Sequence, residues 1–296
     1  MRKKILISKN CSFIAPLLIC TALSTPALSA GKFTSPDILI LGDSQFTFGS
    51  GPSFLDFFQH IKTYCVPKPS QAKNLEKLGD MSVAVIGVRS SSLPSWTART
   101  KQGKSAVCDV DPKWKVNAGS FGTVNKTKNI YIQIGQGPQY QFCQKKQSPF
   151  EAMFADNYYN PKLLVMSFLG NSSQGWANSY DAALRDVQKT MAQLPKDMPC
   201  IFMTTAPSYS KKVNKMRVRA QKNLEKAFRK TNSRCSFVEG LTAETIAANA
   251  GNKSFYRRKK SGAVKDPYHP NKRAAKKFFS IEKNQICKAI FKQVSK

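Results

Sequence analysis

The sequence has few histidines and few acidic residues. It contains 2 His and 17 Asp+Glu against 47 Lys+Arg, and the acidic residues do not cluster with histidine or cysteine in metal-ligand spacing. This scarcity argues against a catalytic metal centre. No two cysteines have the C-x-x-C spacing of a zinc or redox site. Gly135-Gln136-Gly137 lacks the rest of a dinucleotide-binding fingerprint. We therefore expect no metal and no cofactor.

Long apolar runs are also missing after residue 30. Before that point Ile14–Leu23 is apolar, but about ten residues are too few to span a bilayer. A basic start precedes this run and small residues follow it, which is the pattern of a secretory signal peptide. We expect residues 1–30 to be that peptide and the protein to be periplasmic or secreted. The mature chain is expected to have no transmembrane segment.

Residues 31–296 contain no Pro/Gly/Ser-rich linker and no internal repeat, so we expect one domain there. The cysteines that remain after the expected cleavage are Cys65, Cys108, Cys143, Cys200, Cys235 and Cys287. Their even number in an exported protein favours disulfide bonds. The connectivity is open except for one suggested pair. Cys200 and Cys235 each precede an apolar run, and the two runs can form neighbouring strands.

The excess of basic residues gives a formal net charge of +30. Such a charge attracts polyanions, which include anionic polysaccharide, lipopolysaccharide, a membrane surface and nucleic acid. Because we expect the protein to be exported, polymers of a cell envelope are the favoured partners, and we expect no nucleic-acid partner. The alternative is a generally basic surface without any specific site, because net charge does not identify one.

Short apolar runs alternate with helical patterns along the chain. The runs are Asp37–Leu41, Met81–Val88, Asn129–Ile134, Leu163–Leu169, Cys200–Thr204 and Cys235–Val238. Helical periodicity lies between and after them, at Phe54–Ile61, Tyr180–Leu194, Val213–Phe228 and from Asn271 to Ile290. This alternation predicts an α/β fold in which a parallel sheet has helices on both faces. Residues 89–128 and 135–160 fit neither pattern, and we expect them to be inserted loops.

Two short segments carry candidate chemistry. Ser44 follows the apolar run Ile38–Leu41 and Gly42-Asp43, which places it at the carboxyl edge of the expected sheet, where open α/β folds bind ligands. A serine hydroxyl needs a base to become a nucleophile. His269 is the candidate base, and Asp266 lies three residues before it in a turn restricted by prolines. A carboxylate there would fix the histidine tautomer.

In order and spacing these motifs resemble those of the SGNH hydrolases, also called the GDSL esterase/lipase family. The resemblance implies a flavodoxin-like, three-layer α/β/α fold with a parallel sheet of about five strands. It also implies ester hydrolysis by a triad of Ser44, His269 and Asp266. Val85–Ser90 and Leu169–Ser172 match the blocks that complete the family's oxyanion hole. The resemblance therefore implies backbone N–H donors at Ser44 and Ser90 and the side-chain amide of Asn171.

This sequence departs from the family pattern in those two blocks. The family usually has glycine where Ser90 stands, and it usually reads Gly-x-Asn-Asp where this chain has Leu169-Gly170-Asn171-Ser172. A serine still offers its backbone N–H, and Asn171 keeps the amide. Asp43 is expected to stabilise the turn before the nucleophile rather than to take part in the chemistry.

The residues leave three functions open. The first is an exported serine esterase that hydrolyses or transfers acyl esters, such as O-acetyl groups of an envelope glycan. The second is a lipase or lysophospholipase, in which an aromatic cluster lines an acyl pocket; core packing is the alternative role for these rings. The cluster comprises Phe46, Phe48, Phe54, Phe57 and Phe58. The third is a non-catalytic envelope protein that binds polyanions on the same scaffold.

Overall fold

The computed structural model describes residues 35–78, 82–99, 107, 116–121, 130–134 and 146–295. In this part of the chain a seven-stranded sheet has the strand order β4-β3-β2-β1-β5-β6-β7. The strands are β1 (Ile38–Gly42), β2 (Val83–Gly87), β3 (Val116–Phe121), β4 (Ile130–Ile134), β5 (Leu163–Ser167), β6 (Cys200–Met203) and β7 (Ser236–Val238). The neighbours from β2 to β7 pair in parallel, whereas β3 pairs antiparallel with both β2 and β4.

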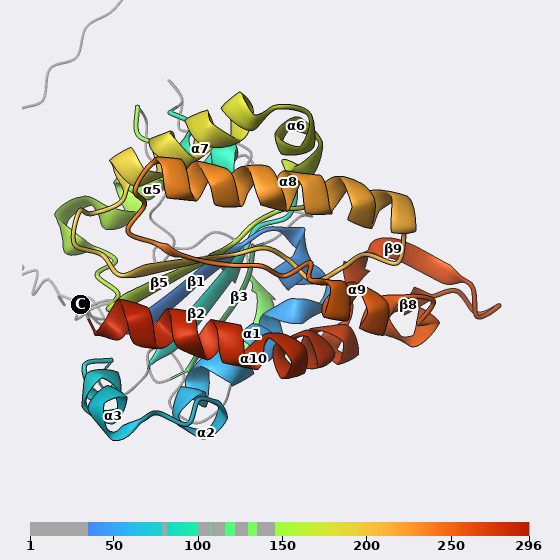
Figure 1. Cartoon of the computed structure of the whole chain (residues 1–296), viewed down its shortest axis with the longest axis horizontal. Helices are drawn as coiled ribbons and strands as arrows, with labels where there is room; N and C mark the ends of the chain where they lie inside the picture. The colour runs from blue at the N-terminus through green and yellow to red at the C-terminus, as the bar shows by residue number, and fades with distance from the viewer. Residues whose placement is uncertain are drawn as a thin grey trace, which may run out of the picture. The chain divides into compact units, whose positions relative to one another are not determined.

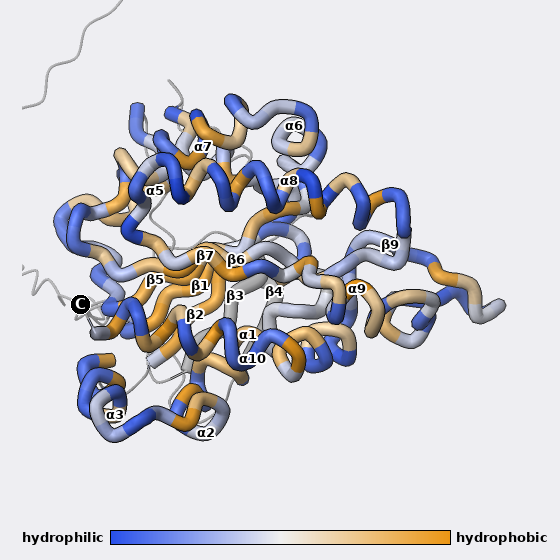
Figure 2. Tube along the Cα trace, in the orientation of Figure 1, coloured by the Kyte–Doolittle hydropathy of each residue, from blue (hydrophilic) through white to orange (hydrophobic). Residues whose placement is uncertain are grey.

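The strands at the centre of the sheet are buried on both faces because their side chains alternate between two cores. In β1, Leu39 and Leu41 belong to one hydrophobic cluster, and Ile38 and Ile40 belong to the other. This period of two is the geometry of an extended chain, and a strand that is apolar at every position must be covered on both sides. Figure 2 shows the hydrophobic strands between helices whose outer positions are hydrophilic.

Helices form the two outer layers (Figure 1). The layer with α10 (Lys272–Val294) includes α1 (Gly51–Gln59), α2 (Ile61–Tyr64) and α3 (Pro69–Glu76). The opposite layer contains α4 (Leu93–Thr97), α5 (Pro149–Phe154), α6 (Ser173–Asn178), α7 (Tyr180–Gln193) and α8 (Lys211–Lys230). A helix α9 (Ala243–Asn249) and the two-stranded sheet of β8 (Tyr256–Arg258) and β9 (Val264–Pro270) precede α10. No helix in the described residues combines the length and the apolar character that crossing a membrane requires.

The predicted three-layer α/β/α fold is confirmed, and the four predicted helices correspond to α1, α7, α8 and α10. The sheet differs from the prediction at one edge. β3 lies within the expected loop 89–128, and β4 is antiparallel rather than parallel to its neighbour. β3 was missed because its sequence, VNAGSF, contains Asn, Gly and Ser, which are poor signals for a strand. Trp114, Cys108, Cys143 and the expected signal peptide lie outside the described residues.

The parallel strands have the order β2-β1-β5-β6-β7, which is the flavodoxin-like order when they are counted along the chain. The chain adds β2 on one side of β1, and it adds β5, β6 and β7 on the other side, so the direction of the connections reverses between β1 and β5. Ligands in open α/β sheets bind outside the carboxyl ends of the strands at such a switch point. Ser44 follows β1, and Gly170-Asn171 follow β5, so both candidate blocks lie at the switch point.

Two disulfide bonds join described cysteines. Cys200–Cys235 confirms the suggested pair and connects the starts of the neighbouring strands β6 and β7, with 4.4 Å between the Cα atoms. Cys65–Cys287 connects the end of α2 to α10 across a sequence separation of 222. The second bond closes most of the chain into one loop, and a longer loop restricts the unfolded state more strongly.

Replacing Cys65 and Cys287 together by serine is expected to lower the free energy of unfolding by about 2–5 kcal/mol. The matched change, Cys200→Ser with Cys235→Ser, should cost less because its loop spans 35 residues rather than 222. Urea unfolding of both variants under non-reducing conditions measures the difference. An unchanged unfolding midpoint in the Cys65/Cys287 variant would contradict this account of the long-range bond.

Candidate active site

The structure brings together the three residues predicted as a triad. The Oγ atom of Ser44 lies 2.9 Å from Nε2 of His269, and Nδ1 of His269 lies 2.9 Å from Oδ2 of Asp266. In the tautomer that carries its proton on Nδ1, His269 donates to the carboxylate and accepts from the Ser44 hydroxyl. Ser44 is 9% exposed and the His269 side chain is 20% exposed. This is the geometry of a serine beside an oriented general base.

Asp266 is held by its own strand. Its Oδ1 atom accepts hydrogen bonds from the backbone N–H groups of Tyr268 at 3.1 Å and of His269 at 3.2 Å. Across the two-stranded sheet, Nη2 of Arg257 lies 3.8 Å from Oδ2. The segment was expected to be a turn, whereas the structure makes it the strand β9, paired irregularly with β8. Prolines are tolerated in such an edge strand, and the carboxylate reaches the ring as predicted.

The loop that carries Ser44 packs directly on the segment that carries His269. Nε2 of Gln45 donates to the carbonyl of Tyr268 at 3.1 Å. Gly49 has φ +148°, and a Cβ atom at this position would lie 3.0 Å from the Cα atom of Asn271. Only glycine adopts this backbone conformation without strain and leaves room for such a close approach. Ser44 and His269 are therefore positioned by contacts between their loops as well as by their own hydrogen bond.

The candidate oxyanion-hole blocks lie beside this loop and are connected to each other. Nδ2 of Asn171 donates to the carbonyl of Ser91 at 2.7 Å, which links the turn after β5 to the turn after β2. Ser90 and Asn171 are both exposed at this edge of the sheet. Ser90 has φ +60°, a left-handed conformation that favours glycine. In this chain a serine adopts that conformation.

Asp43 is buried and connects two of these turns. Its Oδ1 atom accepts from the N–H of Gln45 at 2.8 Å, and its Oδ2 atom accepts from the N–H of Gly170 at 3.2 Å. The first bond stabilises the turn before the nucleophile, as predicted. The second holds the neighbouring Asn171 in place. Burial raises the pKa of the Asp43 carboxyl, and the hydrogen bond from Gln45 and the nearby charge of Arg217 oppose that rise.

Arg217 is a site residue that sequence reasoning missed. It lies on α8, is 4% exposed, and places Nη2 near Gly170, on the same side as the Asp43 carboxylate. Burial lowers the pKa of the guanidinium, and Asp43 is the first of the charges that oppose this effect. Within the described residues, Nε and Nη1 of Arg217 have no hydrogen-bond acceptor. The nearby charge of Asp43 therefore offsets part of the cost of burying this cation, although the two side chains form no direct ion pair.

A sequence signal for Arg217 existed. The residue lies four positions after Val213 and three before Ala220, so it shares the apolar stripe of its helix. An arginine on a buried stripe requires a buried anion as its partner. The basic background of the helix hid this signal, because the other arginines and the lysines of α8 are exposed.

The second histidine of the chain, His60, and the described rings of the phenylalanine cluster have structural roles. His60 ends α1, its side chain is 46% exposed, and its Nδ1 atom lies 2.9 Å from the carbonyl of Asp56. Of the phenylalanine cluster, the described side chains are buried in the core beside α10, with Phe54 and Phe279 rings 4.8 Å apart. The core-packing alternative is therefore confirmed for Phe46, Phe54, Phe57 and Phe58. The described residues contain no group of three or more His, Cys, Asp or Glu side chains that could hold a metal ion.

Replacing Arg217 by methionine is expected to lower the free energy of unfolding by about 3 kcal/mol, because the buried Asp43 carboxylate loses a nearby positive charge. Arg219→Met is the matched control. Arg219 is exposed on the same helix, and its loss should change stability by less than about 0.5 kcal/mol. Urea unfolding compares the two variants. Equal stability of both would show that Asp43 does not depend on Arg217.

Comparison with known proteins gives similarity at the level of solved structures. No protein-family model matches the chain, and no curated protein matches it. A structure from Slackia heliotrinireducens, described as an SGNH hydrolase, is 14% identical over 87% of this chain and 100% of its own, with a TM-score of 0.40. A DUF4886 family protein from Bacteroides uniformis is 11% identical over 88% and 83%, with a TM-score of 0.41.

A third similar structure is a family two carbohydrate esterase from Clostridium thermocellum in complex with cellohexaose. It is 12% identical over 90% of this chain and 67% of its own, with a TM-score of 0.39. At these identities and TM-scores the similarity assigns no activity, substrate or site residue to this chain.

Proposed function

We propose that this protein is an exported serine esterase that removes or transfers short acyl groups on a glycan. The observation that carries the proposal is the chain of two 2.9 Å contacts from Ser44 through His269 to Asp266. Its position at the switch point of the sheet supports the proposal, because this is where open α/β folds bind their ligands. The two disulfides are consistent with the export that the N-terminal pattern predicts.

In the first half of the reaction, the Ser44 hydroxyl attacks the carbonyl carbon of the ester. Its proton passes to Nε2 of His269, and Asp266 stabilises the imidazolium that forms. The carbonyl oxygen becomes an oxyanion, for which the N–H groups of Ser44 and Ser90 and the amide of Asn171 are the proposed donors. The C–O bond to the leaving alcohol then breaks, His269 returns the proton to that alcohol, and the acyl group stays on Ser44.

In the second half, another hydroxyl takes the acyl group. His269 removes a proton from water, the resulting oxygen attacks the acyl carbon, and Ser44 leaves with the proton that His269 returns. Hydrolysis releases a carboxylic acid. Attack by a sugar hydroxyl in place of water would complete an acyl transfer with the same residues, and the acceptor decides between the two outcomes.

Two features favour a short acyl group on a sugar. The described phenylalanines of the cluster are in the core beside α10 rather than in an acyl pocket. Tyr268 is 51% exposed and directly precedes His269. An exposed aromatic ring beside the catalytic base offers an apolar face for a sugar ring. The net charge of +30 would concentrate the protein on an anionic envelope polymer.

Hydrolysis of nitrophenyl acetate tests this function. His269→Gln should lower kcat by at least about 10³-fold, because the serine loses its base. His60→Gln is the matched control, since it changes the only other histidine and lies outside the site. Loss of activity in both variants, or in neither, would contradict the assignment of His269. Comparison of acetyl with long-chain esters then separates an acetylesterase from a lipase.

Asn171→Ala is expected to lower kcat by about 10²–10³ through loss of an oxyanion donor, with little change in KM. Ser90→Gly should retain activity because the backbone N–H stays. Its free energy of unfolding should change by no more than about 1 kcal/mol, because relief of the left-handed strain opposes the added freedom of the unfolded chain. Wild-type kcat in Asn171→Ala would remove this amide from the proposed oxyanion hole.

A further inference from the structure

The exposed surface of α10 carries positive charge along its whole length. Its only acidic residue, Glu282, is 4% exposed and bonds to Thr242 and Gln285. The exposed cations are Lys272, Arg273, Lys276, Lys277, Lys283, Lys288 and Lys292. A helix of this length extends about 35 Å at 1.5 Å per residue. These cations lie on more than one side of the helix. None of them forms an ion pair within the described part of the chain.

Three hollows follow one another along this helix. The first has a volume of about 500 Å³ and is lined by residues that include Asn271, Lys272 and Lys276. Lys276 also lines the second, of about 190 Å³, together with Lys283. Lys283 also lines the third hollow, which has a volume of about 730 Å³ and is lined by Lys292 towards the other end of α10. Each hollow shares a lysine with the next, so the three are neighbours along the helix, and together they are called the track.

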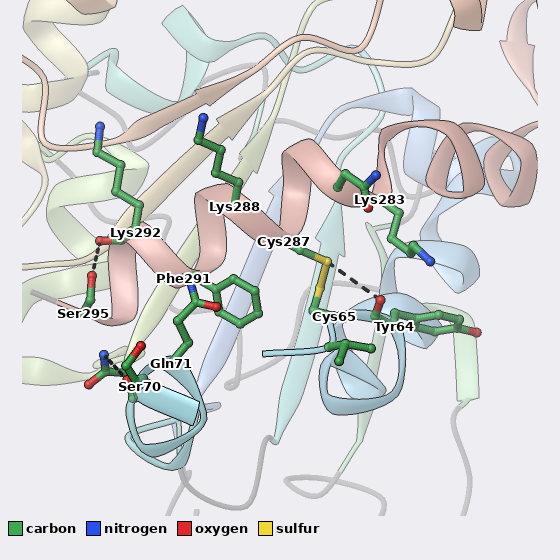
Figure 3. A pocket seen from close by; sticks show the side chains of 13 residues that line it. Tyr64, Cys65, Ser70, Gln71, Lys283, Cys287, Lys288, Phe291, Lys292 and Ser295 are labelled. Carbon is green, nitrogen blue, oxygen red and sulfur yellow. Dashed lines mark hydrogen bonds between the residues drawn. A yellow bond between two sulfur atoms is a disulfide. The ribbon is translucent and has the colours of Figure 1, made fainter. Parts of the chain in front are cut away.

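The track combines charge with apolar surface. In its third hollow Phe291 and the Cys65–Cys287 disulfide lie between α10 and the segment of α2 and α3 (Figure 3). Lys283 extends beside Tyr64, whereas Lys288 and Lys292 point away from α3. Tyr64, which is 37% exposed, lines the second and third hollows, and Val66, which is 85% exposed, lines the third. Phe57 and Phe279 lie at the second hollow but are buried. Asp56 is the only acidic residue among the lining residues of the three hollows.

One end of the track reaches the candidate active site. Asn271, which lines the first hollow, is the N-cap of α10 and accepts from the N–H groups of Arg273 and Ala274. It lies two residues after His269 and packs against Gly49 of the Ser44 loop. Tyr256 and Arg258 of β8, the partner strand of β9, line the same hollow. A long molecule bound along α10 would therefore end beside the triad.

We propose that the track along α10 binds a linear acidic polysaccharide and delivers it to Ser44; this rests on the proposed esterase function. The cations that line the three hollows fit a chain that carries carboxylates, and the exposed side chains of Tyr64 and Val66 among them fit sugar rings. A membrane fits less well. A helix that lies on a bilayer presents its apolar face to lipid, whereas the apolar face of α10, with Phe278, Ile286 and Ile290, is buried against the sheet.

Binding of the full chain to polygalacturonate, which carries carboxylates and no ester, tests the track without any need for catalysis. The test variant is Lys276→Gln with Lys283→Gln and Lys288→Gln. The matched control is Lys212→Gln with Lys215→Gln and Lys222→Gln, which removes the same charge from exposed positions of α8. α8 lies in the opposite helical layer (Figure 1). Dextran serves as the uncharged polymer, and vesicles of phosphatidylglycerol and phosphatidylcholine serve as the membrane.

The α10 variant is expected to bind polygalacturonate about tenfold more weakly at low salt, since three exposed charge contacts are lost. The α8 variant should bind like wild type, and wild-type binding should weaken as salt rises. An equal loss of affinity for polygalacturonate in both variants would show that binding depends only on net charge, and this would overturn the proposal. Stronger binding to the vesicles than to the polymer, dependent on α10, would overturn it in favour of a membrane. Absence of polymer binding would also overturn it. Absence of esterase activity with polymer binding retained would instead contradict the proposed function and the delivery to Ser44, and would leave the binding site on α10.

Discussion

The candidate site depends on one long-range contact, between the loop after β1 and the segment that enters α10. Ser44 and His269 are 225 residues apart in sequence, and their side chains meet at 2.9 Å. The hydrogen bond from Gln45 to the carbonyl of Tyr268 and the close packing of Gly49 on Asn271 support the same contact. One hydrogen bond contributes about 1 kcal/mol, so the position of His269 relative to Ser44 depends on the packing of these two segments as a unit.

A second layer of support lies beneath the turns. Asp43 joins the turn after β1 to the turn after β5 through its bonds to Gln45 and Gly170, and Arg217 places its charge beside it. Buried charge is costly, and the attraction between nearby opposite charges offsets part of that cost. The arrangement fixes where Asn171 stands relative to Ser44. The cationic track along α10 begins at the same place, so the chemistry and the proposed polymer site share one anchor at Asn271.

Much of the fold could be predicted because its central strands are apolar at successive positions, as in Ile38–Leu41. β3 could not, because Asn117, Gly119 and Ser120 interrupt that signal. The triad residues could be named because a serine at a strand end and an Asp-x-x-His motif each have a chemical reason. The sequence could not predict that Arg217 lies near Asp43 or that Cys65 pairs with Cys287. Both depend on contacts between segments that are far apart in sequence. Only the three-dimensional packing shows them.

The central claim is that Ser44 is a nucleophile activated by His269. Mass spectrometry of the intact protein after treatment with a serine-directed phosphonate, followed by peptide mapping, measures this directly. The account predicts one covalent adduct, located at Ser44, that forms much more slowly when His269 is replaced by glutamine. No adduct, or an adduct on another residue, would contradict it.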